Sequence, residues 1–457
     1  MQASLTQGLA ACEGPQLSAW LQRIEAQHAV AKAGPRADMD LSERSLARVQ
    51  QMIDRLGIQF ACPVMTVGGT NGKGSTCAML EAILCAGGFK AGRYSSPHLL
   101  RFNERASING QPVSDEALIA SFEAVWRCDV RELTYFEFTT LAILHLFASV
   151  QLDAVILEVG LGGRLDAVNA IDADCAVITS VDLDHMAYLG ATREHIGFEK
   201  AHIFRPGRVA ICCDPNPPAS IGQVAAKLGA QLWQFGRDIH YQAHGQDHPS
   251  LARAMPQWQY IGPGSRRASL PYPALRGANQ LLNACAALAA LEALAAAFPL
   301  SQQAVRQGLL TVNLPGRFQI LPGQPTVVLD VAHNPHAAAC LAQSLDSQGY
   351  YPNTHAVVGV LRDKDIEGVL RPLRERVDVW HVAPTQGARG LEAAQLAQAV
   401  QAQAPRSSAV HVYASGQEAF EGARRAMATD DRMIVFGSFA LVGEVMRQLK
   451  ADGGGVH

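Results

Sequence analysis

The sequence comprises 457 residues, of which 48% are hydrophobic and 17% are charged, and its formal net charge at pH 7 is −3. This length allows two or three domains with sizeable cores, and the composition is that of an ordinary globular protein. The small net charge creates no global field that would attract a polyanion, which argues against nucleic-acid binding.

Cysteine spacing and hydropathy argue against a zinc-binding, a disulfide-rich or a membrane protein. Ten cysteines are scattered along the chain, and no two have the two-residue spacing of a zinc site or suggest a disulfide framework. The most apolar stretch, residues 281–298, is mainly alanine and contains Glu292, so it predicts a buried helix and not a membrane span. The first residues lack the basic and apolar regions of a secretory signal, and we expect a cytoplasmic protein without membrane contact.

A glycine-rich segment follows the first predicted strand. Helices are predicted at residues 17–31 and 42–56, and apolar residues 64–67 then form a strand that precedes four glycines and a helical pattern. A strand, a glycine-rich turn and a helix can cradle phosphate, because glycines let the backbone approach oxygen atoms and the helix N-terminus presents N–H groups. We therefore expect a nucleotide site with Lys73 as its cation; the alternative is an ordinary glycine-rich turn.

The segment departs from the standard phosphate loop. That pattern has Gly six residues before the Lys and a hydroxyl residue directly after it, where this chain has Val67 and Gly74. The residues expected to bind ATP in this loop are Asn71, Gly72, Lys73, Gly74, Ser75 and Thr76. Only seven lysines occur against 31 arginines, and Arg poorly replaces a compact or modifiable amine. The lysines in polar turns, Lys73 and Lys200 among them, are therefore candidates for chemistry.

Polar residues recur where the next strands end. Ser96 follows the strand at 90–95, Glu158 closes the strand at 154–159, and His185 with two aspartates follows the strand at 174–180. A buried carboxylate costs several kcal/mol unless it is paired or binds a metal, and magnesium prefers oxygen ligands. The carboxyl ends of parallel strands meet at one edge of a sheet. We expect a metal site there; the alternatives are solvated strand ends and ordinary turns.

The rest of the chain alternates strands with helices. Helices are predicted at 114–126 and 137–149, a further strand at 208–213, a small antiparallel annex at 231–272, and a long helix at 278–297. After a junction near residues 313–317 the alternation restarts, with strands at 326–331, 355–361, 378–383, 409–414 and 432–437. This pattern predicts an α/β protein with two doubly wound parallel sheets, in domains 1–312 and 313–457.

The loop from Gly69 to Ser75 resembles that of the Mur ligase superfamily, and its Lys-Gly-Ser ending is similar to the folylpolyglutamate synthase branch. The resemblance runs in order from about residue 60 to 450 and is nearest to the bacterial dihydrofolate synthase/folylpolyglutamate synthase family. It implies a P-loop ATPase domain with a parallel sheet and the annex, followed by a smaller Rossmann-like domain that binds glutamate. It also implies two Mg²⁺ ions and admits a monovalent cation.

Site residues are assigned by this resemblance. The implied metal ligands are Ser96, Glu158, His185 and a carbamylated Lys200. The implied nucleotide contacts outside the loop are Asn283, Arg317 and Asp330. His333 and Ser438 are placed near the incoming glutamate, and Lys73, Lys200 and His333 are the expected catalytic residues. Asn279 stands where the family usually has His and is not assigned a role.

Two segments match those that hold the pterin in that family. They contribute Thr134, Tyr135, Phe136 and Glu137, and Leu165, Asp166 and Ala167. The amino-terminal substrate loop, residues 39–44, is shorter than usual and lacks glycine, so Asp40 is its expected contact.

The resemblance implies an amide ligase that uses ATP, L-glutamate, dihydropteroate and reduced folates. We expect a monomer, although the sequence does not show the oligomeric state. The γ-phosphoryl group would pass to a substrate carboxylate, and the glutamate amine would attack the acyl phosphate. A monofunctional folylpolyglutamate synthase, a Mur-type ligase acting on a peptidoglycan precursor, and a nucleotide-switched binding module remain alternatives. Whether one or both folate reactions run, and the length of the product, are left open.

Overall fold

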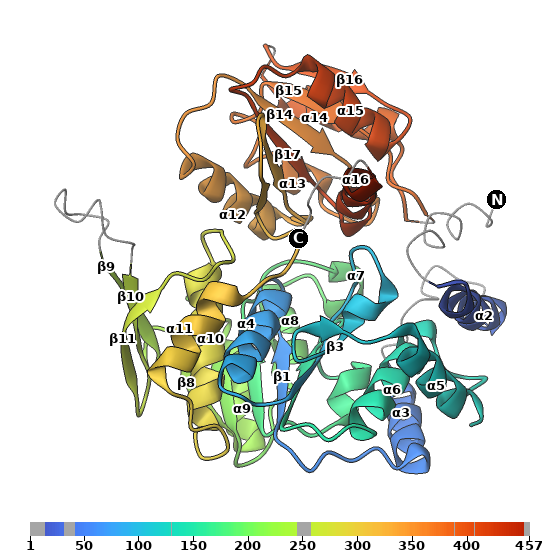
Figure 1. Ribbon diagram of the computed structural model, residues 1–457, viewed down its shortest axis with the longest axis vertical. Coiled ribbons are helices and arrows are strands. Elements are labelled where there is room, and N and C mark those ends of the chain that lie inside the picture. Colours follow the sequence, from blue (N-terminus) through green and yellow to red (C-terminus); the bar gives the residue numbers. More distant parts are fainter. Residues whose placement is uncertain are drawn as a thin grey trace. The chain divides into compact units, whose positions relative to one another are not determined.

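The computed structural model of the chain describes residues 14–31, 42–128, 130–244, 257–387, 389–405 and 407–451. They form two compact units (Figure 1). The first contains the residues up to Ala274 together with Leu281–Val312, and the second contains Leu275–Gln280 and the residues from Asn313 on. The sequence-based boundary also lay between residues 312 and 313, but it did not assign 275–280 to the second unit.

The first unit is built on an eight-stranded sheet with the order β4-β3-β2-β5-β1-β6-β7-β8. Its strands are β1 (Val64–Gly68), β2 (Ala91–Tyr94), β3 (Ala106–Ile108), β4 (Gln111–Pro112), β5 (Ala154–Glu158), β6 (Cys175–Ile178), β7 (Val209–Cys212) and β8 (Gln231–Gln234). Six strands run parallel, and β3 and β4 add an antiparallel edge that was not predicted. All five residues of β1 are buried, as its apolar sequence predicts.

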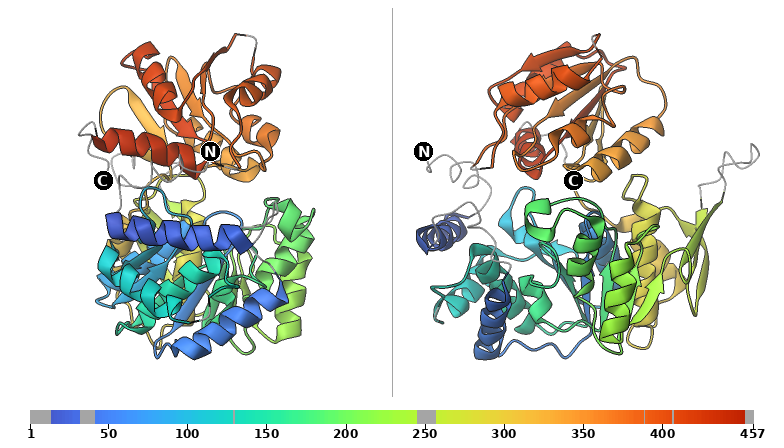
Figure 2. Two further views of the ribbon diagram at one scale, coloured as in Figure 1. Left: turned by 90° about the vertical axis from the view of Figure 1, so that its right-hand side faces the viewer. Right: turned by 180° about the vertical axis from the view of Figure 1, so that it is seen from behind.

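Helices cover this sheet (Figure 2). They are α2 (Pro15–Ala31), α3 (Glu43–Leu56), α4 (Lys73–Ala86), α5 (Asp115–Trp126), α6 (Tyr135–Ala148), α7 (Met186–Leu189), α8 (Arg193–Ala201), α9 (Ala219–Leu228), α10 (Gln280–Ala293) and α11 (Gln302–Thr311). Helix α4 packs against α11, where a side chain at Gly308 would collide with the Ile83 backbone. Helices α2 and α5 pack together, as do α5 and α6.

The predicted annex at 231–272 is only partly correct. Its first strand, β8, pairs in parallel with β7 and is the last strand of the main sheet. The separate three-stranded sheet consists of β9 (His240–His244), β10 (Gln257–Ile261) and β11 (Arg266–Pro271). The sequence-based interpretation erred because α9 ends at Gly229 with φ 71°, which completes one more strand–helix–strand crossover before the antiparallel strands begin.

The second unit has a six-stranded sheet with the order β12-β13-β17-β14-β15-β16. Its strands are β12 (Gln319–Leu321), β13 (Thr326–Leu329), β14 (Thr354–Val358), β15 (Val379–Val382), β16 (Ala409–Val412) and β17 (Arg432–Phe436). Its helices are α12 (Pro335–Asp346), α13 (Ile366–Leu370), α14 (Ala393–Gln403), α15 (Gly416–Ala426) and α16 (Phe439–Ala451). All pairings are parallel except that of the unpredicted β12 with β13. The predicted α/β class with two largely parallel sheets is confirmed.

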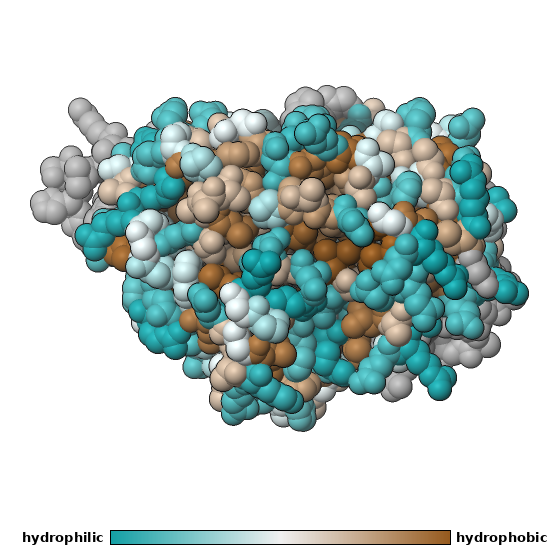
Figure 3. All heavy atoms as spheres, turned by 90° about the horizontal axis from the view of Figure 1, so that it is seen from below, coloured by the Kyte–Doolittle hydropathy of each residue, from teal (hydrophilic) through white to brown (hydrophobic). Residues whose placement is uncertain are grey.

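The surface carries hydrophilic and hydrophobic side chains side by side. On the face shown in Figure 3, hydrophilic side chains (teal) border a band of more hydrophobic ones (brown). Within the described ranges, no helix combines the length and the apolar character needed to cross a membrane.

Candidate active site

The phosphate loop depends on two glycines. Gly69 has φ 142° and Gly72 has φ 87°, values that L side chains rarely adopt. A side chain at Gly69 would collide with Thr179 Oγ1, and one at Gly72 would collide with Asn283 Oδ1. Helix α4 begins directly after Gly72. The loop therefore follows a backbone path that only glycine permits, and the predicted contact Asn283 lies against it.

Two lysines converge on this loop. Lys73 Nζ donates to the carbonyl oxygens of Gly69 at 3.0 Å and Thr70 at 3.2 Å, and Lys200 Nζ donates to the same Gly69 oxygen at 3.0 Å. Lys200 is buried on α8. Desolvation, and to a lesser degree the charge of Lys73, lowers the pKa of Lys200 to about 7. Two residues 127 positions apart in sequence thus meet at one carbonyl group.

The end of β6 holds the loop in place. Thr179 Oγ1 donates to Asn71 O at 2.6 Å, and Ser180 Oγ accepts from Asn71 N at 3.1 Å. Thr70 Oγ1 donates to Asp182 O at 3.1 Å and accepts from Asp182 N at 3.0 Å. Thr70, Thr179 and Ser180 were not among the site residues assigned from the sequence. The run of hydroxyl residues after β6 could have indicated the last two, and all three side chains support the backbone of the loop.

The four implied metal ligands lie at the carboxyl edge of adjacent strands. Glu158 ends β5, is buried and pairs in register with Val67 of β1. Ser96 follows β2, the other neighbour of β5. His185 follows β6 with φ 51°, and its backbone N–H donates to Asp184 Oδ1 at 2.8 Å. Lys200 reaches the loop after β1, as described above.

A purely His, Cys, Asp and Glu metal cluster is not formed. Among the residues that the structure describes, no three such side chains group as a metal site. A cation at this edge would thus draw on a hydroxyl group, a modified lysine and ligand oxygen atoms besides Glu158 and His185. One polar atom in the first turn of α4 fits a bound group: Thr76 Oγ1 is buried and has no hydrogen-bond partner.

Phe136 and Asp166 meet at Gly160. A side chain at Gly160 would collide with the Phe136 ring and lie 3.3 Å from Asp166 Oδ2. Asp166 is buried and accepts hydrogen bonds from the N–H groups of Leu161 at 2.8 Å and Val168 at 3.0 Å. Desolvation raises the pKa of Asp166 to about 6. Two of the predicted pterin contacts are therefore brought together. Leu165 is partly exposed and Ala167 is buried beside them.

Thr134 and Glu137 have structural partners. They form a capping box at the start of α6, in which Thr134 N donates to Glu137 Oε2 at 2.7 Å and Glu137 N donates to Thr134 Oγ1 at 3.2 Å. Glu137 also accepts from Ser45 and forms an ion pair with Arg48 at 2.7 Å. This carboxylate fastens α3 to α6. Tyr135 is partly exposed on the same turn.

The predicted contact Asp40 lies outside the described residues.

In the second unit, the predicted residues lie just before β12 and after the ends of β13 and β17. Asp330, after β13, accepts from Phe318 N at 2.8 Å and Ala332 N at 2.7 Å. Desolvation raises the pKa of Asp330, and the charge of Arg317 opposes this rise. The Arg317 guanidinium lies 5.0 Å from the Phe439 ring centroid.

His333 and Ser438 lie at neighbouring strand ends. His333 Nδ1 donates to Val331 O at 2.8 Å, and the His333 and Phe439 ring centroids are 5.9 Å apart. Ser438 is buried and caps α16 by accepting from Leu441 N at 3.1 Å. Gly437 N donates to Ala332 O at 2.9 Å, which joins the two strand ends. The structure thus brings these residues together within the second unit.

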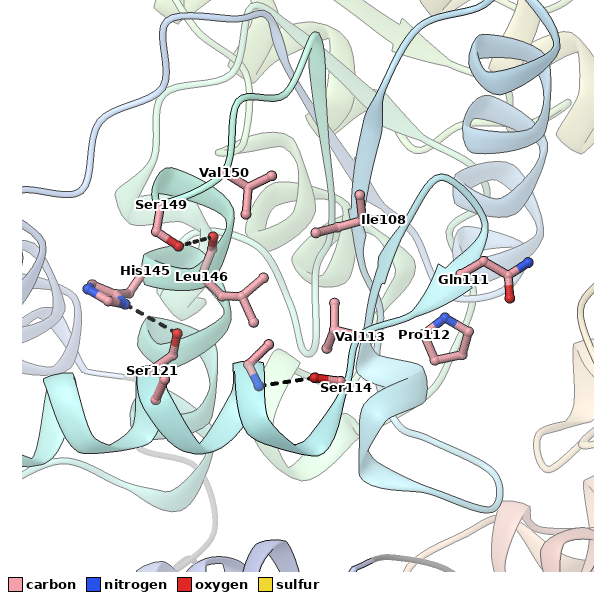
Figure 4. A pocket seen from close by; sticks show the side chains of 12 residues that line it. Ile108, Gln111, Pro112, Val113, Ser114, Ser121, His145, Leu146, Ser149 and Val150 are labelled. Carbon is pink, nitrogen blue, oxygen red and sulfur yellow. Dashed lines mark hydrogen bonds between the residues drawn. The ribbon is translucent and has the colours of Figure 1, made fainter.

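A groove of about 540 Å³ lies away from these residues, between the β3–β4 hairpin, α5 and α6 (Figure 4). Its lining is mostly apolar, with Ile108, Val113 and Leu146 facing the hollow, and His145 Nδ1 is 3.3 Å from Ser121 Oγ at its rim. None of the predicted site residues lines it.

Comparison with known proteins gives two family matches and several close relatives. Residues 67–291 match the Mur ligase middle domain family, and residues 316–439 match the Mur ligase glutamate ligase domain family. The dihydrofolate synthase/folylpolyglutamate synthase of Escherichia coli K12 is 41% identical over 438 residues, which cover 95% of this chain and 96% of that relative. The relative from Haemophilus influenzae is 38% identical over 450 residues, with coverages of 94% and 96%.

Solved structures show the same similarity. The E. coli FolC structure in complex with DHPP and ADP has a TM-score of 0.85 at 41% identity and covers 96% of this chain and 98% of its own. A bifunctional folylpolyglutamate synthase/dihydrofolate synthase with Mn, AMPPNP and L-glutamate bound has a TM-score of 0.82 at 43% identity, with coverages of 95% and 98%. The chain therefore belongs to the dihydrofolate synthase/folylpolyglutamate synthase family, and it is a ligase of the Mur ligase type.

Proposed function

We propose that this chain uses ATP to add L-glutamate to dihydropteroate, which yields dihydrofolate, and to reduced folates, which yields polyglutamates. The convergence of Lys73 and Lys200 on the Gly69 carbonyl, at the strand edge that carries Glu158, is the observation that supports it best. The E. coli relative, which is 41% identical over 95% of this chain, carries both activities in its name.

The phosphates of ATP would lie at the start of α4. Lys73 supplies a positive charge there, and the N-terminal N–H groups of the helix favour an anion. Asn283, which contacts Gly72, is proposed to bind the nucleotide from the side. The buried Thr76 hydroxyl would then find the partner that it lacks.

We propose that two Mg²⁺ ions, and in addition a monovalent cation, bind at the carboxyl edge of the first sheet. Ser96, Glu158, His185 and carbamylated Lys200 would hold the divalent ions. The chemistry that such ions supply is stabilisation of the charge that develops during phosphoryl transfer. Because no three His, Cys, Asp or Glu side chains group as a metal site in the described part of the chain, we propose that phosphate oxygens of the nucleotide complete the coordination.

Transfer of the γ-phosphoryl group to the substrate carboxylate would form an acyl phosphate and release ADP. The amine of glutamate would attack the acyl carbon, expel inorganic phosphate and lose a proton, so that an amide forms. In the second unit, His333 donates through Nδ1 to Val331 O, so its neutral form keeps the lone pair on Nε2. We propose that Nε2 receives the proton of the glutamate amine, with Ser438 near the glutamate and Arg317 and Asp330 at the nucleotide.

Phe136 and Asp166 are proposed to bind the pterin. An aromatic face can stack on the pterin ring, and a carboxylate can accept from its N–H edge. This pair favours folate substrates over the peptidoglycan precursor of a Mur-type ligase. Because a preformed folate carries the same ring, the pair does not separate the bifunctional enzyme from a monofunctional folylpolyglutamate synthase.

The test is ADP release by the purified chain with Mg²⁺ and L-glutamate. The proposal expects turnover with dihydropteroate and with tetrahydrofolate, and none when either glutamate or the pterin substrate is omitted. Turnover with tetrahydrofolate alone would leave the monofunctional synthase. Nucleotide hydrolysis that does not depend on glutamate would instead support a switched binding module.

A further inference from the structure

A buried ion pair connects the helix after the phosphate loop to the strand before Ser96. Arg93 Nε on β2 donates to Glu81 Oε2 on α4 at 2.6 Å, and both side chains are buried. The same guanidinium donates through Nη1 to Ser95 Oγ at 2.8 Å. Ser95 directly precedes Ser96, one of the proposed metal ligands. Arg93 thereby ties two parts of the proposed site to each other.

The carboxylate of Glu81 is fully engaged in this arrangement. Its second oxygen accepts from Ser107 Oγ at 2.6 Å and from Gly110 N at 2.9 Å. These contacts attach the β3–β4 hairpin to α4. One oxygen of Glu81 accepts from Arg93 and the other accepts from the hairpin. Glu81 therefore holds the guanidinium in a fixed position relative to α4 and the hairpin.

Arg93 and Glu158 lie on the same face of two neighbouring strands. Arg93 pairs in register with Ile156, and Glu158 stands two residues further along β5. Because side chains alternate along a strand, Ile156 and Glu158 point to the same side. Desolvation alone would lower the pKa of Arg93, but the charges of Glu81 and, more weakly, Glu158 raise it. The guanidinium therefore lies within electrostatic reach of a second proposed metal ligand.

We propose that Arg93 is a positioning residue for the divalent metal: it fixes Ser95, and with it Ser96, relative to Glu158. The inference rests on the function proposed above. A buried arginine is expensive to desolvate, and an apolar side chain would often pack as stably. A guanidinium, however, offers planar donors in fixed directions and can hold a carboxylate and a hydroxyl group at once.

We propose that Arg93 positions Ser95 and Ser96 through the geometry of its hydrogen bonds and not through its charge. The Arg93–Glu81 pair carries no net charge, so it adds little repulsion toward a cation beside Glu158. Removing both charges together keeps the net charge of the pair at zero while it removes the ion pair and the link to Ser95. The double variant Arg93→Met/Glu81→Gln does this, because the introduced amide keeps an oxygen that can accept from Ser107 and Gly110.

The experiment measures Mn²⁺ binding by electron paramagnetic resonance in the presence of a non-hydrolysable ATP analogue, together with thermal unfolding. The proteins are the wild type, Arg93→Met, the double variant, and Arg432→Met as a control. Arg432 is a buried arginine of the second unit that donates to Leu345 O at 2.9 Å. Its loss should lower the unfolding temperature without changing Mn²⁺ affinity.

We expect Arg93→Met to unfold at a lower temperature and to bind Mn²⁺ about tenfold more weakly, as residues that orient metal ligands typically do. The double variant should regain thermal stability but keep the weaker Mn²⁺ binding. Recovery of both properties together, or unchanged Mn²⁺ affinity in the double variant, would overturn the inference even if Arg93→Met fails to fold. Absence of Mn²⁺ binding by the wild type would instead refute the proposed function.

Discussion

Lys73 and Lys200 donate hydrogen bonds to one carbonyl oxygen, that of Gly69, each at 3.0 Å. Desolvation by burial, together with the smaller repulsion from the ammonium group of Lys73, lowers the pKa of Lys200 to about 7. At neutral pH the neutral form of Lys200 is therefore far more accessible than that of an ordinary lysine, whose pKa is about 10.4. A neutral amine is the form that reacts with CO₂ to give a carbamate and a proton.

The first prediction concerns this modification. Lys200→Arg should lose activity nearly as fully as Lys200→Ala, on the order of 10²- to 10³-fold in kcat, because the proposed function needs a carbamate oxygen and not a positive charge. A short carboxylic acid should partly restore Lys200→Ala. The carbamate itself can be sought by ¹³C NMR after incubation with labelled bicarbonate. An Arg variant with full activity would contradict the prediction.

The second prediction is that Lys73→Ala abolishes turnover while the fold survives. The Lys73 ammonium group donates to the Gly69 and Thr70 carbonyl oxygens of its own loop, so its removal should cost few tertiary contacts. Turnover should fall by at least about 10²-fold, because the charge on the transferred phosphoryl group is no longer offset. ATP-dependent ligation and thermal unfolding are measured together.

Lys227→Ala, which removes an exposed lysine from α9, is the matched control. It should leave both properties unchanged. Near-normal ligation by Lys73→Ala would remove the central role given to the phosphate loop.

The third prediction is a pH dependence of stability in the second unit. Buried His381 lies between His355 Nδ1, at 3.1 Å, and Tyr413 OH, at 3.0 Å. Desolvation, with smaller contributions from His355 and His411, lowers the pKa of His381 to about 3. The native state therefore resists protonation that the unfolded chain accepts near pH 6.5. Stability is complete above that pH and is lost as the pH falls toward 3.

At pH 5 this single group should cost about 2 kcal/mol relative to neutral pH. Hydrogen exchange in β14 and β15 between pH 7 and pH 5, corrected for intrinsic rates, measures the loss. His381→Phe should lower the overall stability but flatten its pH dependence. His411→Gln changes the exposed register partner of His381 and removes one of the smaller contributions to its lowered pKa, so it should reduce the slope much less than His381→Phe does. An unchanged slope in His381→Phe would contradict the assignment.

Much of this architecture follows from local sequence. The strand that ends at Gly68 and the helix after Gly72 are dictated by apolar runs and by glycines that permit positive φ, and the structure places them as expected. Strands β3, β4 and β12 were not predicted, because two or three residues carry no periodic pattern.

Side-chain partners were harder to predict than elements. Glu137 is predicted to contact the pterin, and nothing in the sequence indicated that its carboxylate also contacts Ser45 and Arg48, about 90 residues earlier. The Arg93–Glu81 link depends on the register of β2 against β5 and on the rotation of α4, which neither periodicity nor composition specifies. Sequence therefore predicts where polar groups gather, whereas tertiary packing decides which of them are available to a ligand.

The last prediction concerns the pterin. Asp166→Ala should weaken dihydropteroate binding by about 2–4 kcal/mol, because two pterin donors would lose their partner. ATP affinity should hardly change. The same carboxylate accepts from Leu161 N and Val168 N, so the Ala variant also loosens this turn, and thermal unfolding must be recorded beside affinity. Asp166→Asn keeps one oxygen acceptor for the turn and should separate the two effects, losing pterin affinity with a smaller loss of stability.

Dihydrofolate synthase activity should fall much further in these variants than glutamate addition to a preformed reduced folate, which can bind in a different pose. The comparison uses kcat and KM for both substrates in each variant. Equal losses that lie in kcat and not in affinity would assign Asp166 to the metal site, since its charge already acts on Lys200 across that edge of the sheet. If the wild type forms no dihydrofolate from dihydropteroate, the bifunctional proposal fails, and the glutamate-adding synthase alone remains.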